Sequence, residues 1–127
     1  MATPTKIKLH KSSGELELQF PGLEPFRLSS EYLRVHSPSA EVKGHGPGQE
    51  VLQFGKKNVR ITQLERNGNY AIRITFDDDH DSGIFSWDYL LELGENFESN
   101  WNTYLKKLHD AGKSRDPEEQ VVKFFDL

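Results

Sequence analysis

The feature that most constrains the fold is a pair of alternating apolar runs on either side of Asn67-Gly68. The first run spans 58–66 and the second 70–76, and apolar and polar residues alternate in both. A period of two is typical of half-buried strands, because successive side chains of a strand point to opposite faces. Asn-Gly tolerates the positive φ angles of a type I′ turn, so the sequence predicts a β-hairpin here.

A second pair of alternating runs, at 7–9 and 16–20, lies near the start of the chain, with the polar, glycine-containing segment 11–14 between them. This pattern predicts another hairpin with a longer loop. The apolar piece 23–28 is predicted to be a third short strand, and 84–85 is another short apolar stretch.

Helices are predicted where capping residues precede suitable segments. Ser29 or Ser30 precedes a brief helix that ends before Pro38, and Ser86 precedes a helix over 87–93 with Gly94 at its expected stop. The segment 37–49 is rich in glycine and proline and is predicted to be a long surface loop.

The clearest predicted helix spans 97–111 and is amphipathic. Its apolar residues recur at helical spacing and fall on one stripe, which we expect to pack on the core. Asn96 is expected to cap its start and Gly112 to close its end. The stripe consists of Phe97, Trp101, Tyr104, Leu105 and Leu108.

These elements predict an α+β fold, a mainly antiparallel sheet of about five or six strands with short helices and one amphipathic C-terminal helix. With 127 residues the chain has room for one domain, which we place at 1–112. Residues 113–127 are predicted to be a tail, polar at first and then apolar at five of its last seven positions. The tail either packs back on the sheet or docks on a partner through Phe124 and Phe125, and a homodimer that exchanges tails is left open.

Composition excludes several classes of function. The chain has 16 Lys and Arg against 20 Asp and Glu, and the net charge of -4 argues against a nucleic-acid partner. The absence of Cys excludes disulfides, thiolate nucleophiles and cysteine-ligated zinc. Because the start of the chain lacks an apolar run and no stretch of about 18 apolar residues occurs, we expect no membrane span and a cytoplasmic location.

No motif in the sequence indicates catalysis. GxSxG is absent, and the glycine-rich 44–48 lacks the lysine and hydroxyl of a phosphate-binding loop. The acidic run 77–81 lacks the order of a calcium loop and is predicted to be a solvated turn whose Asp side chains bond backbone N–H groups. No histidine pair has zinc-site spacing, and a metal site formed by His36, His45 and His80 in space remains an alternative.

The order of several segments resembles the family named for the N-terminal domain of gamma-butyrobetaine hydroxylase. These segments are LRVHSPSAEV at 33–42, KGHGPGQ at 43–49 and GNYAIRITFDDDHDSGIFSW at 68–87. The resemblance spans residues 5–94, and the segment 43–49 is similar to the stand-alone bacterial branch. Members of this family are also fused to iron–sulfur carrier ATPases in plastids.

In the hydroxylases, the matching segments hold a structural zinc with three Cys and one His. Laid on this chain, the Cys positions fall on Ser37, Ser39 and Val42, and the His position falls on His80. Neutral hydroxyls are poor substitutes for thiolates and valine cannot coordinate a metal, so we expect no zinc and no other cofactor. If a metal were bound nonetheless, Glu41 would join the histidines as a candidate ligand.

The resemblance also implies that this domain is not the catalytic one, because the catalytic iron and 2-oxoglutarate chemistry of the hydroxylases belongs to a separate, larger domain. We therefore expect this chain to be a non-catalytic accessory module that binds a protein partner, and not an enzyme. The alternative is a metal- or iron–sulfur-related accessory protein with histidine ligands.

Overall fold

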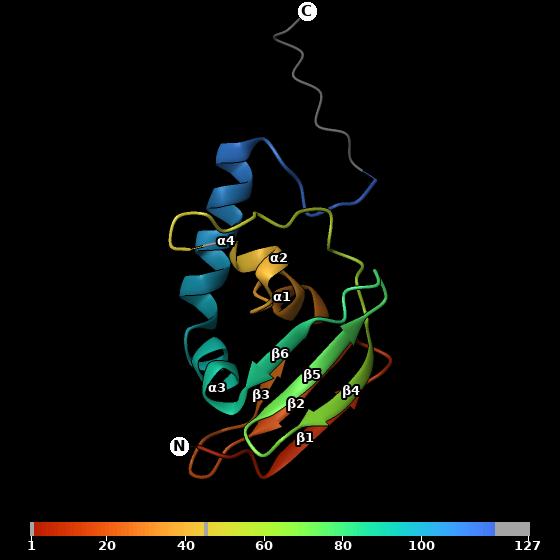
Figure 1. Ribbon diagram of the computed structural model, residues 1–127, viewed down its shortest axis with the longest axis vertical. Helices are drawn as coiled ribbons and strands as arrows, with labels where there is room; N and C mark the ends of the chain where they lie inside the picture. The colour runs from red at the N-terminus through yellow and green to blue at the C-terminus, as the bar shows by residue number, and fades with distance from the viewer. Residues whose placement is uncertain (1, 45, 119–127) are drawn as a thin grey trace, which may run out of the picture.

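A computed structural model, which describes residues 2–44 and 46–118, has two three-stranded antiparallel sheets beside a group of helices (Figure 1). One sheet has the order β1-β2-β3 and the other β4-β5-β6. The predicted α+β class is confirmed, with the six strands divided between two sheets. The strands are β1 (Lys6–His10), β2 (Glu15–Gln19), β3 (Phe26–Leu28), β4 (Ile61–Asn67), β5 (Ala71–Phe76) and β6 (Gly83–Ser86).

The two sheets bury their facing sides in one shared core. Along β2 and β5, buried and half-buried residues alternate, as the sequence period predicts. The core also includes apolar residues from the first and third helices. Its fully buried large side chains include Leu16, Leu18, Phe20, Tyr32, Leu33, Ile74, Phe76, Phe85, Leu90 and Leu93.

The helices of the described chain lie mostly at one end of the sheets, where α4 runs alongside α1 and α2 (Figure 1). They are α1 (Ser30–Val35), α2 (Ala40–Lys43), α3 (Trp87–Glu95) and α4 (Phe97–Ala111). Both predicted serine caps form, because Ser29 Oγ accepts from the Tyr32 N–H at 3.0 Å and Ser86 Oγ accepts from the Tyr89 N–H at 3.1 Å. None of the helices in the described residues is long and apolar enough to cross a bilayer.

The segment predicted as a long surface loop is partly helical and partly buried. Residues 40–43 form α2, and Ser37, Ser39 and Val42 are 1%, 6% and 7% exposed. The Val51 N–H donates to the Val42 carbonyl at 2.8 Å, and this bond holds the chain just after the segment against α2. The glycine and proline content therefore predicted irregular backbone but not its burial.

The Asn67-Gly68 hairpin is present, but its turn differs from the predicted type I′. Asn67 pairs with Ala71, so the loop has three residues, and of Asn67 and Gly68 only the glycine has positive φ, at 65°. The start of α3 holds this loop, because Trp87 donates from its backbone N–H to the Tyr70 carbonyl and from its indole to the Asn69 carbonyl. A tertiary contact thus selects the loop length.

Gly94 lies within α3 and does not stop it. A Cβ at this position would lie 2.7 Å from Phe26 Cγ, so the glycine lets the helix approach the Phe26 ring. The helix continues to Glu95, and the Asn96 side chain donates to the Glu92 carbonyl, leaving the start of α4 without the predicted side-chain cap.

The amphipathic stripe of α4 is buried at its centre and exposed at its edges. Tyr104 and Leu108 pack with Val35 in a second apolar cluster, and Trp101 is half-buried against both clusters. Phe97 and Leu105 are 37% and 38% exposed. The predicted boundaries of this helix are confirmed, with Gly112 in the left-handed conformation at its end.

The first residues of the predicted tail contact the body of the domain. The Gly55 and Lys57 N–H groups donate to the carbonyls of residues 114 and 115, each at 2.9 Å. Arg115 forms a bidentate ion pair with Glu31, whose side chain is 6% exposed, and lies 5.0 Å from the Trp101 ring. Residues 119–127, with Phe124 and Phe125, lie outside the described residues.

Gly94→Ala is predicted to lower the free energy of unfolding. The added methyl group gains about 1 kcal/mol of helix propensity. Its Cβ would lie 2.7 to 2.9 Å from three atoms of the Phe26 ring, so displacing the ring costs more than this gain, about 2–3 kcal/mol. Urea denaturation measures the difference. Gly46→Ala is the matched control, because its Cβ meets nothing within 4 Å. A Gly94→Ala protein as stable as the control would contradict this reading of the α3–β3 contact.

Candidate functional site

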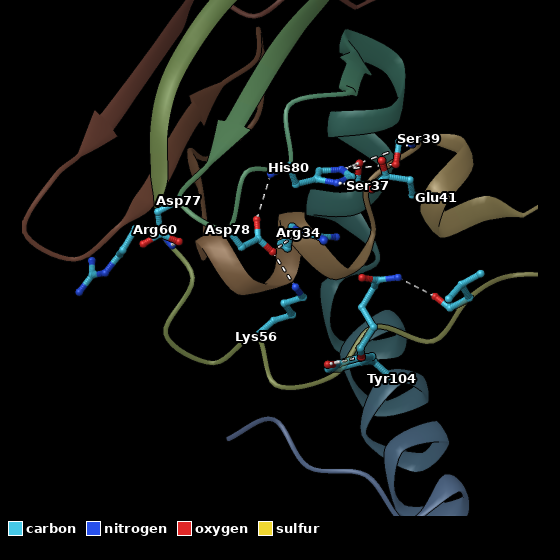
Figure 2. Close-up of polar contacts among 12 residues, drawn as sticks. Arg34, Ser37, Ser39, Glu41, Lys56, Arg60, Asp77, Asp78, His80 and Tyr104 are labelled. Carbon is cyan, nitrogen blue, oxygen red and sulfur yellow. Dashed lines mark hydrogen bonds and ion pairs between the residues drawn. The ribbon is translucent and has the colours of Figure 1, made fainter. Parts of the chain in front are cut away.

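A polar cluster, buried except for the exposed Glu41, joins the α1–α2 segment to the loop between β5 and β6 (Figure 2). At its centre His80 is 4% exposed. Its Nε2 lies 2.8 Å from Ser37 Oγ and 3.3 Å from Ser39 Oγ, and its Nδ1 lies 3.2 Å from Glu41 Oε2. Because a carboxylate only accepts, Nδ1 donates to Glu41, and Nε2 of the neutral ring accepts from a serine hydroxyl. We call these four residues the His80 cluster.

Local backbone features aim these side chains at one another. The loop turns at Asp79, whose φ is 68°, and the Phe76 N–H donates to the His80 carbonyl at 2.9 Å. On the other side, a Cβ at Gly83 would lie 2.7 Å from Ser37 Oγ. Only glycine leaves room there for the hydroxyl, so the start of β6 and the Ser37 segment pack directly together.

The His80 cluster contains three of the four positions that the family resemblance assigned to zinc. Ser37 and Ser39 both reach His80, whereas the fourth position, Val42, contributes a buried apolar side chain. In the described part of the chain, no three His, Asp or Glu side chains gather as a metal would require. The cluster therefore brings together hydroxyls and an imidazole, a donor set that suits hydrogen bonding better than zinc.

The histidines of the alternative metal site are placed as follows. His36 Nδ1 lies 2.9 Å from the Tyr32 carbonyl oxygen, and its ring packs on Tyr32 and Tyr104. His80 makes the contacts described above, and His45 lies outside the described residues. Burial lowers the pKa of His36, so its ring is neutral near neutral pH.

Ser37, His80 and Glu41 have the hydroxyl–imidazole–carboxylate order of acyl-transfer enzymes. Ser37 is only 1% exposed, however, and Gly83 covers its hydroxyl. A substrate carbonyl has no approach to that oxygen in this conformation. The arrangement instead ties two loops together.

The acidic run contains the second set of polar contacts. Asp77 Oδ1 accepts from the Arg60 N–H and Asp78 Oδ1 accepts from the His80 N–H, as predicted. The run is not fully solvated, however, because Asp78 is partly buried and His80 is buried. Asp78 Oδ2 also pairs with Arg34 Nε at 2.9 Å and Lys56 Nζ at 2.6 Å. Sequence reasoning missed these ion pairs, because the partners stand 44 and 22 positions away.

A groove of about 560 Å³ opens beside the His80 cluster. We call it the α2–α4 groove. Its apolar lining comes from α1, α2, the segment 48–53, α3 and α4, and its polar lining includes Lys43, Lys107 and Glu50. The lining residues are Val35, His36, Ser37, Val42, Lys43, Gly48, Glu50, Val51, Leu52, Gln53, Tyr89, Asn100, Thr103, Tyr104 and Lys107.

Two tyrosines brace the walls of this groove. Tyr89 donates its hydroxyl to the His36 carbonyl at 2.6 Å, and Tyr104 donates to the Gln53 carbonyl at 2.9 Å. Burial raises the pKa of Tyr89 to about 12 and raises that of Tyr104 as well, so both hydroxyls remain protonated donors. The sequence offered no signal for this groove, because its aromatic residues have the spacing of core residues and its loop resembles a surface loop.

Comparisons with known proteins identify relatives for most of the chain. The family model described as gamma-butyrobetaine hydroxylase-like, N-terminal, matches residues 7–91 and confirms the resemblance found in the sequence. No curated protein matches.

Solved structures support the same relationship. An NMR solution structure is 53% identical over 97% of both chains, with a TM-score of 0.83. A second NMR solution structure is 44% identical over 97% of this chain and 92% of that one, with a TM-score of 0.78. A crystal structure of a protein of unknown function from Acidithiobacillus ferrooxidans ATCC 23270, of the DUF971 family, is 31% identical over 72% of this chain and 91% of that one, with a TM-score of 0.60.

Stability is predicted to fall when the pH drops below the ordinary histidine pKa of 6.5. Burial, and then the charge of Arg34, lower the pKa of His80. The unfolded chain therefore takes up the proton first, and the stability present above pH 6.5 is lost as the pH falls through the folded-state pKa. Urea denaturation between about pH 7.5 and about pH 5 measures the loss, and imidazole NMR signals separate His80 from His36.

A His80 signal that titrates above 6.5 in the folded protein would contradict the burial argument.

Asp78→Asn is predicted to destabilise the fold by about 3 kcal/mol, because it leaves the buried Arg34 guanidinium without its counter-charge. The Arg34 side chain is 7% exposed. Asp81→Asn, an exposed change in the same run, should alter stability by less than about 0.5 kcal/mol. Denaturant midpoints compare the two, and equal values would show that the ion pairs of Asp78 contribute nothing.

Proposed function

Because the chain belongs to the gamma-butyrobetaine hydroxylase-like N-terminal family, we propose that it is a non-catalytic accessory module that binds a protein partner. The partner docks in the α2–α4 groove, and the proposed setting is the cytoplasm. The observation on which this rests is the groove itself, a preformed apolar hollow with two lysines among its lining residues.

The size and lining of the groove favour an extended peptide segment as its occupant. A volume of about 560 Å³ accommodates one or two large side chains rather than a folded surface. Val35, Val42, Leu52 and Tyr104 provide apolar contact for such side chains. The partner segment therefore presents at least one apolar anchor.

Charge favours an acidic segment. Lys43 and Lys107 both line the groove, and within the described residues neither forms an ion pair with an acid, although Lys43 lies 5.3 Å from the Tyr89 ring centroid. Glu50 is the acid among the lining residues. A carboxylate beside the anchor would meet these lysines, and such complementarity accelerates encounter and selects partners.

The groove is also organised before binding. The tyrosine hydroxyls that bond the His36 and Gln53 carbonyls hold α3 and α4 against the chain segments that complete the walls. A partner therefore does not have to order these walls when it binds, which reduces the entropic cost of association.

Peptides selected from a random display library against the whole protein are predicted to combine an apolar or aromatic residue with a neighbouring carboxylate. Lys107→Glu should weaken their binding by about tenfold, measured by calorimetry. Lys106→Glu is the matched control, because Lys106 is the adjacent helix residue, lies outside the groove and pairs with Asp110.

Three results would contradict the proposed function. The first is a set of selected peptides with no acidic residue, and the second is equal binding by the Lys107→Glu and Lys106→Glu proteins. The third is a set of NMR amide shifts on peptide binding that is confined to residues far from the groove, which would place binding elsewhere, for example on a surface used for self-association.

A further inference from the structure

A second cleft, separate from the α2–α4 groove, lies between α1, the segment 57–60 and the start of α4. We propose that this cleft binds a small phosphate-bearing molecule. Its volume is about 370 Å³, and it shares no lining residue with the groove. The lining residues are Ser13, Ser29, Ser30, Glu31, Lys57, Asn58, Val59, Arg60, Phe97, Trp101 and Arg115.

The charges of the cleft favour an anion. Glu31 is its one acid, and the two oxygens of that carboxylate accept from Arg115 at 2.8 and 2.7 Å. The other two cations of the cleft are Lys57 and Arg60, and neither forms an ion pair within the described residues. Among the charged side chains that line the cleft, three cations therefore stand against one acid, which favours an anionic ligand.

The position of Arg60 is set by the surrounding backbone. Its guanidinium Nη1 lies so close to Gly14 that a Cβ there would come within 2.5 Å, and it makes a 3.4 Å contact with the Ser12 carbonyl. Ser30 ties the adjoining walls together, because its hydroxyl donates to the Gly14 carbonyl and accepts from the Ile61 N–H at 3.2 Å. A backbone carbonyl thus orients the exposed Arg60 side chain at the edge of the cleft.

The kind of anion follows from the donors and the space. A guanidinium presents several N–H donors in one plane and an ammonium presents a point charge, a combination that suits the several oxygens of a phosphate. The 37% exposed ring of Phe97, stacked on Trp101 at 6.2 Å, provides apolar surface for the organic part of the molecule. The small volume and the acidic chain as a whole disfavour a nucleic acid or another long polyanion.

The test is an NMR titration of the complete chain with inorganic pyrophosphate, adenosine triphosphate and adenosine at constant ionic strength. Both phosphate compounds should give saturable shifts at the amides of 57–60 and at the Trp101 indole. The Trp87 indole serves as an internal reference, because it is bonded to the Asn69 carbonyl away from the cleft. Adenosine, which lacks phosphate, should give no saturable shift.

Lys57→Ala and Arg60→Ala should each weaken pyrophosphate binding by about tenfold, the effect of losing one charge-assisted contact. Both side chains can be removed without disturbing a described ion pair. Arg66→Ala, on β4 and outside the cleft, is the matched control and should bind as the unchanged protein does.

The proposal is overturned if neither phosphate compound gives a saturable shift, or if the Lys57→Ala and Arg60→Ala proteins bind as tightly as Arg66→Ala. It is also overturned if adenosine produces the same shifts as adenosine triphosphate, because the apolar surface alone would then account for binding. None of these results bears on the peptide-binding experiment, since the two cavities share no residue.

Discussion

The ion pairs of Asp78 organise the region in which both sets of polar contacts meet. Arg34 has a side chain that is 7% exposed, and a buried guanidinium is stable only with a counter-charge. Asp78 supplies that charge and also binds Lys56, so one carboxylate links α1, the segment before β4 and the loop after β5 (Figure 2). The same carboxyl group accepts from the His80 N–H, which places the imidazole among its serine partners.

In the His80 cluster, hydroxyls occupy positions that the family resemblance assigned to metal-binding thiolates. A net hydrogen bond contributes about 1 kcal/mol, whereas a structural zinc site contributes about 10–16 kcal/mol. Two serine contacts to His80 contribute less than such an ion would. Packing around the cluster adds to these contacts, because Val42 is 7% exposed and Gly83 lies directly against Ser37.

Helix α4 is shared by the two cavities. Tyr104 and Lys107 line the α2–α4 groove, whereas Phe97 and Trp101 line the second cleft. The Asn100 amide donates to the Tyr32 hydroxyl at 3.1 Å, and that hydroxyl donates to the Leu93 carbonyl at 2.6 Å. These bonds fix α4 relative to α1 and α3.

Local chemistry in the sequence was sufficient to predict most of the strands and helices. Alternating burial follows from the two-residue period of a strand, and the starts of α1 and α3 follow from serine hydroxyls that accept backbone N–H groups. These interactions join residues within a few positions of one another, so a single sequence contains both partners in readable order.

Features that involve contacts between distant segments could not be predicted from the sequence. Trp87 bonds to the three-residue loop that follows Asn67, and Phe26 packs against Gly94 within α3. The buried serines of the segment 37–49 and the partners of Asp78 depend on approaches across more than 20 positions. The sequence determined which elements form, because their interactions are local; only the tertiary structure decided which polar groups meet and where cavities open, because those depend on how the elements pack.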